Sequence, residues 1–95
     1  MIIKFKHKGL KELSETDKTS KLPADQLAKI RLMLTRLQAA THPEIMRVPG
    51  YRFHELTGDR EGTYSITVTG NYRITFSFVG QNATNVFYED YHWKI

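Results

Sequence analysis

The 95-residue sequence contains no cysteine. Without thiols the chain can form neither a disulfide framework nor a thiolate zinc site, and a reducing compartment suits it. Long hydrophobic runs are also missing. At the start of the sequence, only three apolar residues precede Lys4. A signal-peptide core needs more, and a membrane span needs about 20 residues. We therefore expect a cytoplasmic protein without membrane association.

Gly- or Ser-rich linkers and internal repeats are absent as well, which excludes a chain of separate modules. A chain of this length buries roughly two-thirds of its unfolded surface in one core, so we expect a single domain over residues 1–95. Fourteen Lys and Arg against ten Asp and Glu give a formal charge of +4. This excess favours an anionic partner, although many soluble proteins of similar charge bind none.

The N-terminal half predicts two helices. Residues 2–5 favour a short strand, and residues 9–15 favour a helix that packs Leu10 and Leu13. A second helix begins at Pro23, which suits a first helical turn, and stops before Pro43. Its apolar stripe consists of Leu27, Ile30, Leu34 and Leu37, and its other face carries Lys29, Arg31 and Arg36. These three cations indicate either a solvated helix face or a contact with RNA.

The C-terminal half predicts strands. Residues 51–56 favour a strand and residues 57–62 a turn, and apolar and polar residues alternate through residues 63–79 about a Gly70-Asn71 turn. After a turn at residues 80–82, residues 85–91 return as the last strand. The predicted fold class is α+β: an antiparallel sheet of four to five strands with two N-terminal helices packed on one face.

Charged and aromatic side chains gather at one end of this sheet. Arg73 has the polar parity of its strand, so its guanidinium should project away from the Ile74 and Phe76 core. His54 lies on an earlier strand, and Asp90 and His92 lie at the end of the last one. Because a four-stranded meander is only about 15 Å across, we expect these side chains to converge on one concave patch.

Residues of these types suit RNA scission by the ribose 2′-hydroxyl. The reaction needs a base, an acid and a cation facing the phosphate. Histidine exchanges protons near neutrality, Asp90 could act as the base or orient an imidazole, and Arg73 could bind two phosphate oxygens. Tyr91 or Trp93 could stack on an unpaired base. The scheme requires no metal and no other cofactor.

A surface or structural role without chemistry stays open for each of these residues. His54 could be a surface histidine, Arg73 a surface ion-pair partner, and Asp90 and His92 a strand cap or partners of Lys94. A metal site of His54, Asp90 and His92 is a weaker alternative, because Asp-x-His spacing alone is unspecific. His7 and His42 receive no role.

The sequence resembles the HigB branch of the RelE/ParE toxin superfamily, the plasmid maintenance system killer proteins. Four stretches carry the resemblance across the whole chain: FKHKGL at residues 5–10, LTGDREG with YSITV at residues 56–68, NYRITF at residues 71–76 and YEDYH at residues 88–92. The resemblance implies a ribosome-dependent mRNA interferase that cleaves translated mRNA without a metal. It also implies a helix-turn-helix antitoxin of the HigA type, through which alone the toxin reaches operator DNA.

The family's active-site positions fall on His54, Arg73, Asp90, Tyr91 and His92, and the residue types match. Arg60, Thr57 and Trp93, with the helix cations Lys29, Arg31 and Arg36, are the expected RNA and phosphate contacts. One position departs from the family pattern, since HigB proteins commonly carry Lys where this chain has Thr57. A hydroxyl brings no charge, so Arg60, Arg52 or Lys94 would have to replace it.

This departure predicts an active toxin that is weaker or has a changed codon preference. It also sustains an alternative, a catalytically weak or inactive toxin-derived module that represses its operon together with the antitoxin. The gyrase-poisoning ParE branch ranks third, because that branch is not expected to retain the YEDYH ending.

Overall fold

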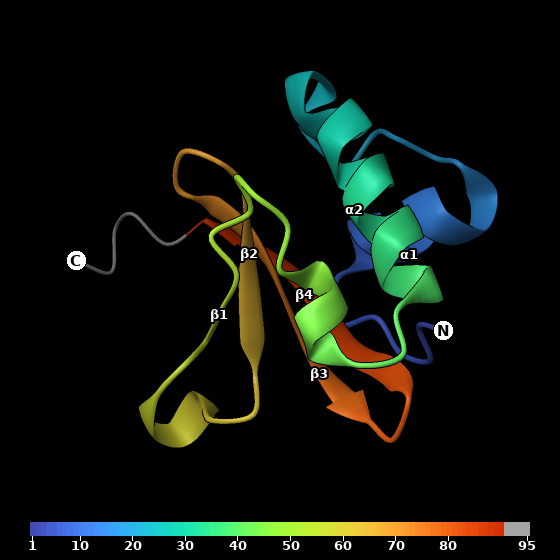
Figure 1. The fold of residues 1–95 in the computed structure, drawn as a ribbon. Helices are drawn as coiled ribbons and strands as arrows, with labels where there is room; N and C mark the ends of the chain where they lie inside the picture. Colours follow the sequence, from blue (N-terminus) through green and yellow to red (C-terminus); the bar gives the residue numbers. More distant parts are fainter. Residues whose placement is uncertain (91–95) are drawn as a thin grey trace.

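The computed structural model describes residues 1–90, in which a layer of helices packs against one sheet (Figure 1). The helical elements are α1 (Lys8–Thr16), η1 (Ala24–Gln26), α2 (Leu27–Ala39), η2 (Pro43–Met46) and η3 (Gly58–Arg60), of which the three η elements are 3-10 turns. The strands are β1 (His54–Glu55), β2 (Tyr64–Thr69), β3 (Tyr72–Val79) and β4 (Asn82–Asp90). Tyr91, His92 and Trp93 lie outside the described residues.

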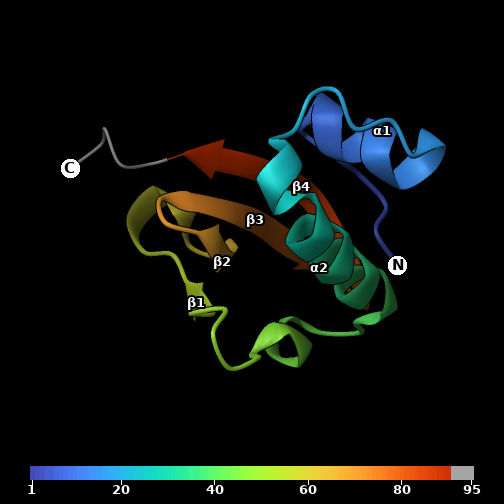
Figure 2. The ribbon, with the colours of Figure 1, turned by 90° about the horizontal axis from the view of Figure 1, so that it is seen from above.

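Within residues 1–90 the sheet has four strands in the order β1-β2-β3-β4, and each strand is antiparallel to its neighbour. Figures 1 and 2 show α1 and α2 gathered at one side of the sheet, with β1 at the far edge. The predicted α+β fold is confirmed. None of the helices within residues 1–90 has the length and apolar character needed to cross a bilayer.

Helix α1 begins at a histidine. The Nδ1 atom of His7 accepts a hydrogen bond from the Leu10 backbone N–H at 3.2 Å, so His7 serves as the N-cap. The helix buries Leu10 and Leu13 and ends at Thr16. The next residue, Asp17, is the C-cap, and its left-handed backbone (φ 60°) lets the Lys18 N–H reach the Glu12 carbonyl. The sequence did not predict this structural role, in which a ring nitrogen replaces the usual capping oxygen.

The second helix follows its apolar stripe but starts later than predicted. Pro23 precedes the turn η1, and the α-helix begins only at Leu27. Three of the four predicted stripe residues are buried, together with Met33, and the helix ends at Ala39, before Pro43 as predicted. The phenol of Tyr88 donates a hydrogen bond to the Gln26 side chain, which joins η1 to β4. Burial raises the pKa of this phenol.

The predicted hairpin at residues 63–79 is confirmed. Thr69 pairs with Tyr72 across the two-residue turn, and Gly70 there has a φ of 51° that glycine adopts without strain. Ile66, Ile74 and Phe76 are fully buried on the side of the helices. Their packing against α1 and α2 fixes which face of each strand is apolar.

The predicted strand at residues 51–56 is mostly wrong, because only His54 and Glu55 pair as β-strand. Arg52 has a left-handed backbone (φ 52°), which interrupts the extended chain. Tyr51 and Phe53 are nevertheless buried in the core. The apolar character of these two residues thus reflects their burial and not a strand.

Two further boundaries differ from the predictions. The expected strand at residues 2–5 is reduced to single parallel bridges, Ile2 to Ala83 and Phe5 to Val86, along the edge of β4. Strand β4 starts at Asn82 instead of residue 85, because a register shift between β3 and β4 accommodates Asn85 with its positive φ of 54°.

Candidate active site

The sheet has a second face, turned away from the helices. One row of paired residues crosses it: His54 opposite Ser65, Ser65 opposite Thr75, and Thr75 opposite Phe87. In the next row Arg73 lies opposite Glu89. Directly paired residues project to the same face, so Arg73 lies opposite the Ile74 and Phe76 core, as the alternation predicts. We call this surface, built from both rows, the open face.

A buried carboxylate joins two arginines on the open face. Glu89 Oε1 accepts a hydrogen bond from Arg60 Nη2 at 3.0 Å, and Glu89 Oε2 lies 3.5 Å from Arg73 Nη2. The side chains of Glu89, Arg73 and Arg60 are 7%, 12% and 39% exposed. Arg60 belongs to η3, between β1 and β2, whereas Glu89 lies on β4 at the other side of the sheet. The three residues therefore form a charged cluster that spans the open face and leaves only Arg60 substantially in solvent.

His54 lies on the same face at its outer edge. It is exposed, and its Nδ1 lies 2.9 Å from the Arg52 carbonyl oxygen, a contact that orients the ring. Strand spacing puts the Cα atoms of His54 and Arg73 roughly 12 Å apart. Both side chains are long enough to approach one phosphate group from opposite sides.

Asp90 lies at the expected end of the sheet but on the other face. It pairs with Tyr72, whose ring stacks on Tyr88 with centroids 5.5 Å apart. The Asp90 charge also contributes to the raised pKa of Tyr88. The expectation that His54, Arg73 and Asp90 share one concave patch is thus wrong for Asp90, because strand alternation separates residue 90 from residue 89.

The open face is hollowed at the end of the sheet away from Asp90. A pocket of about 530 Å³ is lined by Lys6, Asp59, Arg60, Thr63, Thr75, Ser77, Asn85 and Phe87. Thr75 and Ser77 of β3 form its floor. The N-terminal segment and β4 supply one wall, and η3 with Thr63 supplies the other. Arg60 belongs to both this pocket and the charged cluster.

Thr57 lies apart from this pocket. It is exposed and lines a smaller hollow of about 300 Å³ together with Glu55, Leu56, Gly58 and Glu61. Two carboxylates therefore surround the position at which the family pattern has Lys. Arg60, three residues further on, reaches the open face directly.

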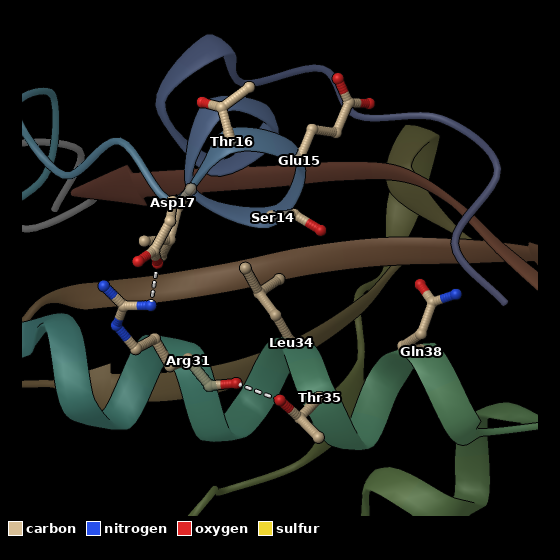
Figure 3. Close-up of a pocket in the computed structure, with 9 residues that line it drawn as sticks. Ser14, Glu15, Thr16, Asp17, Arg31, Leu34, Thr35 and Gln38 are labelled. Atoms are coloured by element: carbon tan, nitrogen blue, oxygen red, sulfur yellow. Dashed lines mark hydrogen bonds and ion pairs between the residues drawn. The ribbon is translucent and has the colours of Figure 1, made fainter.

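The helix cations lie in the other layer. Arg31 forms an ion pair with Asp17 beside a hollow of about 770 Å³ between the end of α1 and α2 (Figure 3). The Arg36 guanidinium lies over the Tyr51 ring at 5.7 Å. Lys29 is exposed beside Val68 and Thr69. None of the three lies on the open face, so they form a separate surface.

No cluster of three or more His, Cys, Asp or Glu side chains suited to a metal ion occurs within residues 1–90. His92, which the weaker metal alternative required, lies outside this range.

Sequence reasoning missed two residues of the open face, Glu89 and Phe87. Both stand in the last strand at the parity that faces Arg73 and Thr75. The signal was a carboxylate on the polar parity of a strand expected to pair with the Arg73 strand. Reading it required the pairing register, which the bulge near Asn85 shifts by one residue.

Comparison with known proteins identifies the family. A family model described as "RelE-like toxin of type II toxin-antitoxin system HigB" matches residues 3–92. The chain is 47% identical to Endoribonuclease HigB of Proteus vulgaris over 92 residues, covering 97% of this chain and 100% of that protein. It is 33% identical to Toxin HigB-1 of Vibrio cholerae serotype O1 over 95 residues, covering 98% and 100%.

A solved structure supports the fold. The YoeB/ParE toxin from Agrobacterium tumefaciens superposes with a TM-score of 0.52 at 16% identity, covering 94% of this chain and 99% of that one. Family model, relatives and fold agree over nearly the whole length. The chain therefore belongs to the HigB-like toxins, RelE-like toxins of type II toxin-antitoxin systems, a membership that implies an antitoxin partner.

Proposed function

We propose that this chain is an endoribonuclease that cleaves mRNA during translation on the ribosome in the cytoplasm, without a metal ion. The observation that carries the proposal is the Arg60–Glu89–Arg73 cluster on the open face. A buried carboxylate with two arginines holds positive charge in a fixed place. The 47% identity to a protein named as an endoribonuclease indicates what that charge is for.

Arg73 and Arg60 would stabilise the phosphate at which the RNA is cut. Negative charge grows on the non-bridging oxygens as the 2′-oxygen attacks phosphorus, and preorganised cations lower the energy of that state. Glu89 accepts one Nη2 hydrogen bond from each arginine, which holds both guanidinium groups in place on the open face. In this scheme Glu89 positions the two cations and does not touch the substrate.

Two histidines would transfer the protons, His54 and His92. One removes the proton of the 2′-hydroxyl, and the other protonates the departing 5′-oxygen, leaving a 2′,3′-cyclic phosphate. Asp90 could act as a base itself or orient an imidazole, and its place beside Tyr72 and Tyr88 favours the second role. Tyr91 and Trp93 are proposed to stack on unpaired bases.

The proposed partners are a helix-turn-helix antitoxin of the HigA type, the ribosome and mRNA, with operator DNA reached only through the antitoxin. Lys29 and Arg36 on the exposed side of α2 are proposed to contact ribosomal RNA. Arg31 would contribute less, because it is paired with Asp17. Reversing the charge of Lys29 and Arg36 should weaken toxicity in a salt-dependent way.

The test is expression of the toxin without antitoxin in a bacterial host, with mRNA 5′ ends mapped by codon position. The wild-type chain should produce cuts in phase with codons. The double variant His54→Ala, His92→Ala should produce none at equal protein level. Cuts without codon phase would refute ribosome dependence, and cuts that persist in the double variant would refute these residues as the proton-transfer groups.

A second candidate rests on Thr57. With no cation there and two carboxylates nearby, the chain could have lost most of its activity and remain as a co-repressor with the antitoxin. Intact mRNA and normal growth, beside tight operator binding by the toxin-antitoxin complex, would favour this reading over the nuclease.

A further inference from the structure

The pocket on the open face is larger than the proposed chemistry requires. The cluster of Arg60, Glu89 and Arg73 accounts for one phosphate, yet a hollow of about 530 Å³ continues past it to the far end of β3. Binding sites for small ligands are commonly about 300 to 1,000 Å³. The hollow is therefore of a size to hold one nucleotide.

One wall of the pocket is aromatic. Phe87 lies opposite Thr75 on the open face and is only partly buried. The His7 ring meets it edge to face at a centroid distance of 5.7 Å, so the phenyl ring is braced from the side of α1. A braced ring at the rim of a pocket offers a surface on which a base can stack.

The remaining lining is polar and carries cations from two directions. Lys6 is exposed, and its backbone N–H is fixed to the Val86 carbonyl at 2.8 Å along β4. Arg60 stands on the opposite wall, held by Glu89. Between them, Ser77 and Asn85 are partly exposed and present a hydroxyl and an amide group able to bond the edge of a base. Among the described residues of the lining, Asp59 is the one carboxylate against Lys6 and Arg60, so their formal charge is positive.

We propose that this pocket is a nucleotide subsite. It binds one nucleotide of the RNA strand that flanks the cut, with its base against Phe87 and its phosphate between Lys6 and Arg60. The inference rests on the proposed endoribonuclease activity and extends it, because it assigns the sequence context of cleavage to residues outside the proton-transfer set. Since Arg60 lines the pocket and also shares Glu89 with Arg73, an RNA strand can continue from the scissile phosphate into the pocket.

The test measures binding before it measures cleavage. Purified full-length toxin is titrated with AMP, CMP, GMP and UMP separately, and backbone amide shifts are followed by NMR. The expected shifts concentrate at Ser77, Asn85 and Phe87. Phe87→Leu, which keeps an apolar side chain without a flat ring, should weaken the dissociation constant about 5- to 10-fold.

Lys6→Gln should weaken the same constant about twofold at low salt and less at high salt. This second variant keeps the test decisive if Phe87→Leu unfolds, because Lys6 is exposed. Lys4→Gln is the matched control, two residues earlier on the same segment and outside the pocket. In the 5′-end maps, Phe87→Leu should alter the nucleotide preference at one position beside the cut and leave codon phasing unchanged.

The possible results distinguish a failure of the nucleotide subsite from a failure of the proposed endoribonuclease activity. Nucleotide binding that Phe87→Leu and Lys6→Gln weaken supports the subsite even if wild-type toxin cuts no mRNA, in which case only the proposed activity fails. No binding at the pocket would overturn the subsite, even in a toxin that cuts in codon phase. Binding that Lys4→Gln weakens as much as Lys6→Gln would also overturn it, because that result is general charge attraction.

Discussion

The two faces of the sheet are built from the same three long strands and bury opposite kinds of side chain. On the helix face, Ile66, Ile74 and Phe76 are fully buried against α1 and α2. On the open face, the buried residues include Thr75 at 2% exposure and Glu89 at 8%. Apolar burial stabilises the fold by about 25 cal/mol per Å², whereas a buried charge costs free energy unless it is paired.

This difference means that stability alone accounts for the residues buried on one face and not for those buried on the other. Replacing a buried ion pair by apolar residues of similar size is often neutral or stabilising. The charged cluster around Glu89 is therefore poorly explained as a stabilising device. The proposed function gives it a purpose, which is to hold Arg60 and Arg73 in place for an anionic substrate.

Breaking the helix face should have the largest effect on stability. Phe76→Ala removes a fully buried ring, and we expect it to lower the free energy of unfolding by about 3 to 5 kcal/mol. Val79→Ala on the same strand, at a position 61% exposed, should cost less than about 0.5 kcal/mol. Urea unfolding of both variants measures the contrast. A loss as small as that of the control would contradict the assignment of this face to the core.

Substitutions in the charged cluster of the open face should lower the free energy of unfolding by an intermediate amount. Glu89→Gln leaves a mostly buried guanidinium at Arg73 without the carboxylate charge, and we expect a loss of about 2 to 3 kcal/mol. Arg60→Gln should cost below about 1 kcal/mol, because Arg60 is more exposed and solvent screens its charge.

A double-mutant cycle with Glu89→Gln and Arg73→Gln tests the coupling, also by urea unfolding. The double variant should lose less than the sum of the single variants, because each single variant already removes the Glu89–Arg73 ion pair. Additive losses would show that the two side chains do not stabilise each other.

The free energy of unfolding should depend on pH through His7, which lies at the edge between the two faces of the sheet. His7 caps α1 and touches both Phe87 and Tyr88, and burial lowers its pKa below the usual 6.5. As the pH falls below 6.5, the unfolded chain takes up a proton that the folded chain resists. Folded stability is therefore lost through that range and levels off below the folded pKa.

His7→Asn keeps a good N-cap and removes this titration. Its unfolding free energy should fall less between pH 7 and pH 5 than that of the wild type, as measured by thermal or urea unfolding at each pH. Equal pH dependence in both proteins would mean that other groups cause the acid sensitivity.

The smallest expected effect concerns position 57, where this chain has Thr and the family pattern has a positively charged Lys. Thr57→Lys places an ammonium group in an exposed hollow that also holds Glu55 and Glu61. We expect potency in growth arrest to rise by less than about fivefold, because these carboxylates and solvent screen the added charge. Thr41→Lys, exposed in the loop before η2, adds the same net charge elsewhere and should leave potency unchanged. Identical potency of Thr57→Lys and wild type would show that Arg60 already meets the need.

Local pattern sufficed wherever neighbours in sequence were also neighbours in space. The alternation in residues 63–79 predicted the hairpin and its apolar face, and helical spacing predicted the packing of Ile30 and Leu37. The same reasoning failed at residues 51–56, because a left-handed backbone at Arg52 leaves no trace in hydrophobicity. It also failed for Asp90, where one residue of parity decides which face a side chain joins.

The sequence alone determined the fold class, the core stripes and the family, since these depend on periodicity and on motifs read in order. Only the tertiary structure decided which charges meet. Glu89 joins Arg60 and Arg73 across 29 and 16 positions of the chain, and that meeting depends on a strand register that includes a bulge. Register is set by packing across the whole sheet, so no local stretch of residues specifies it.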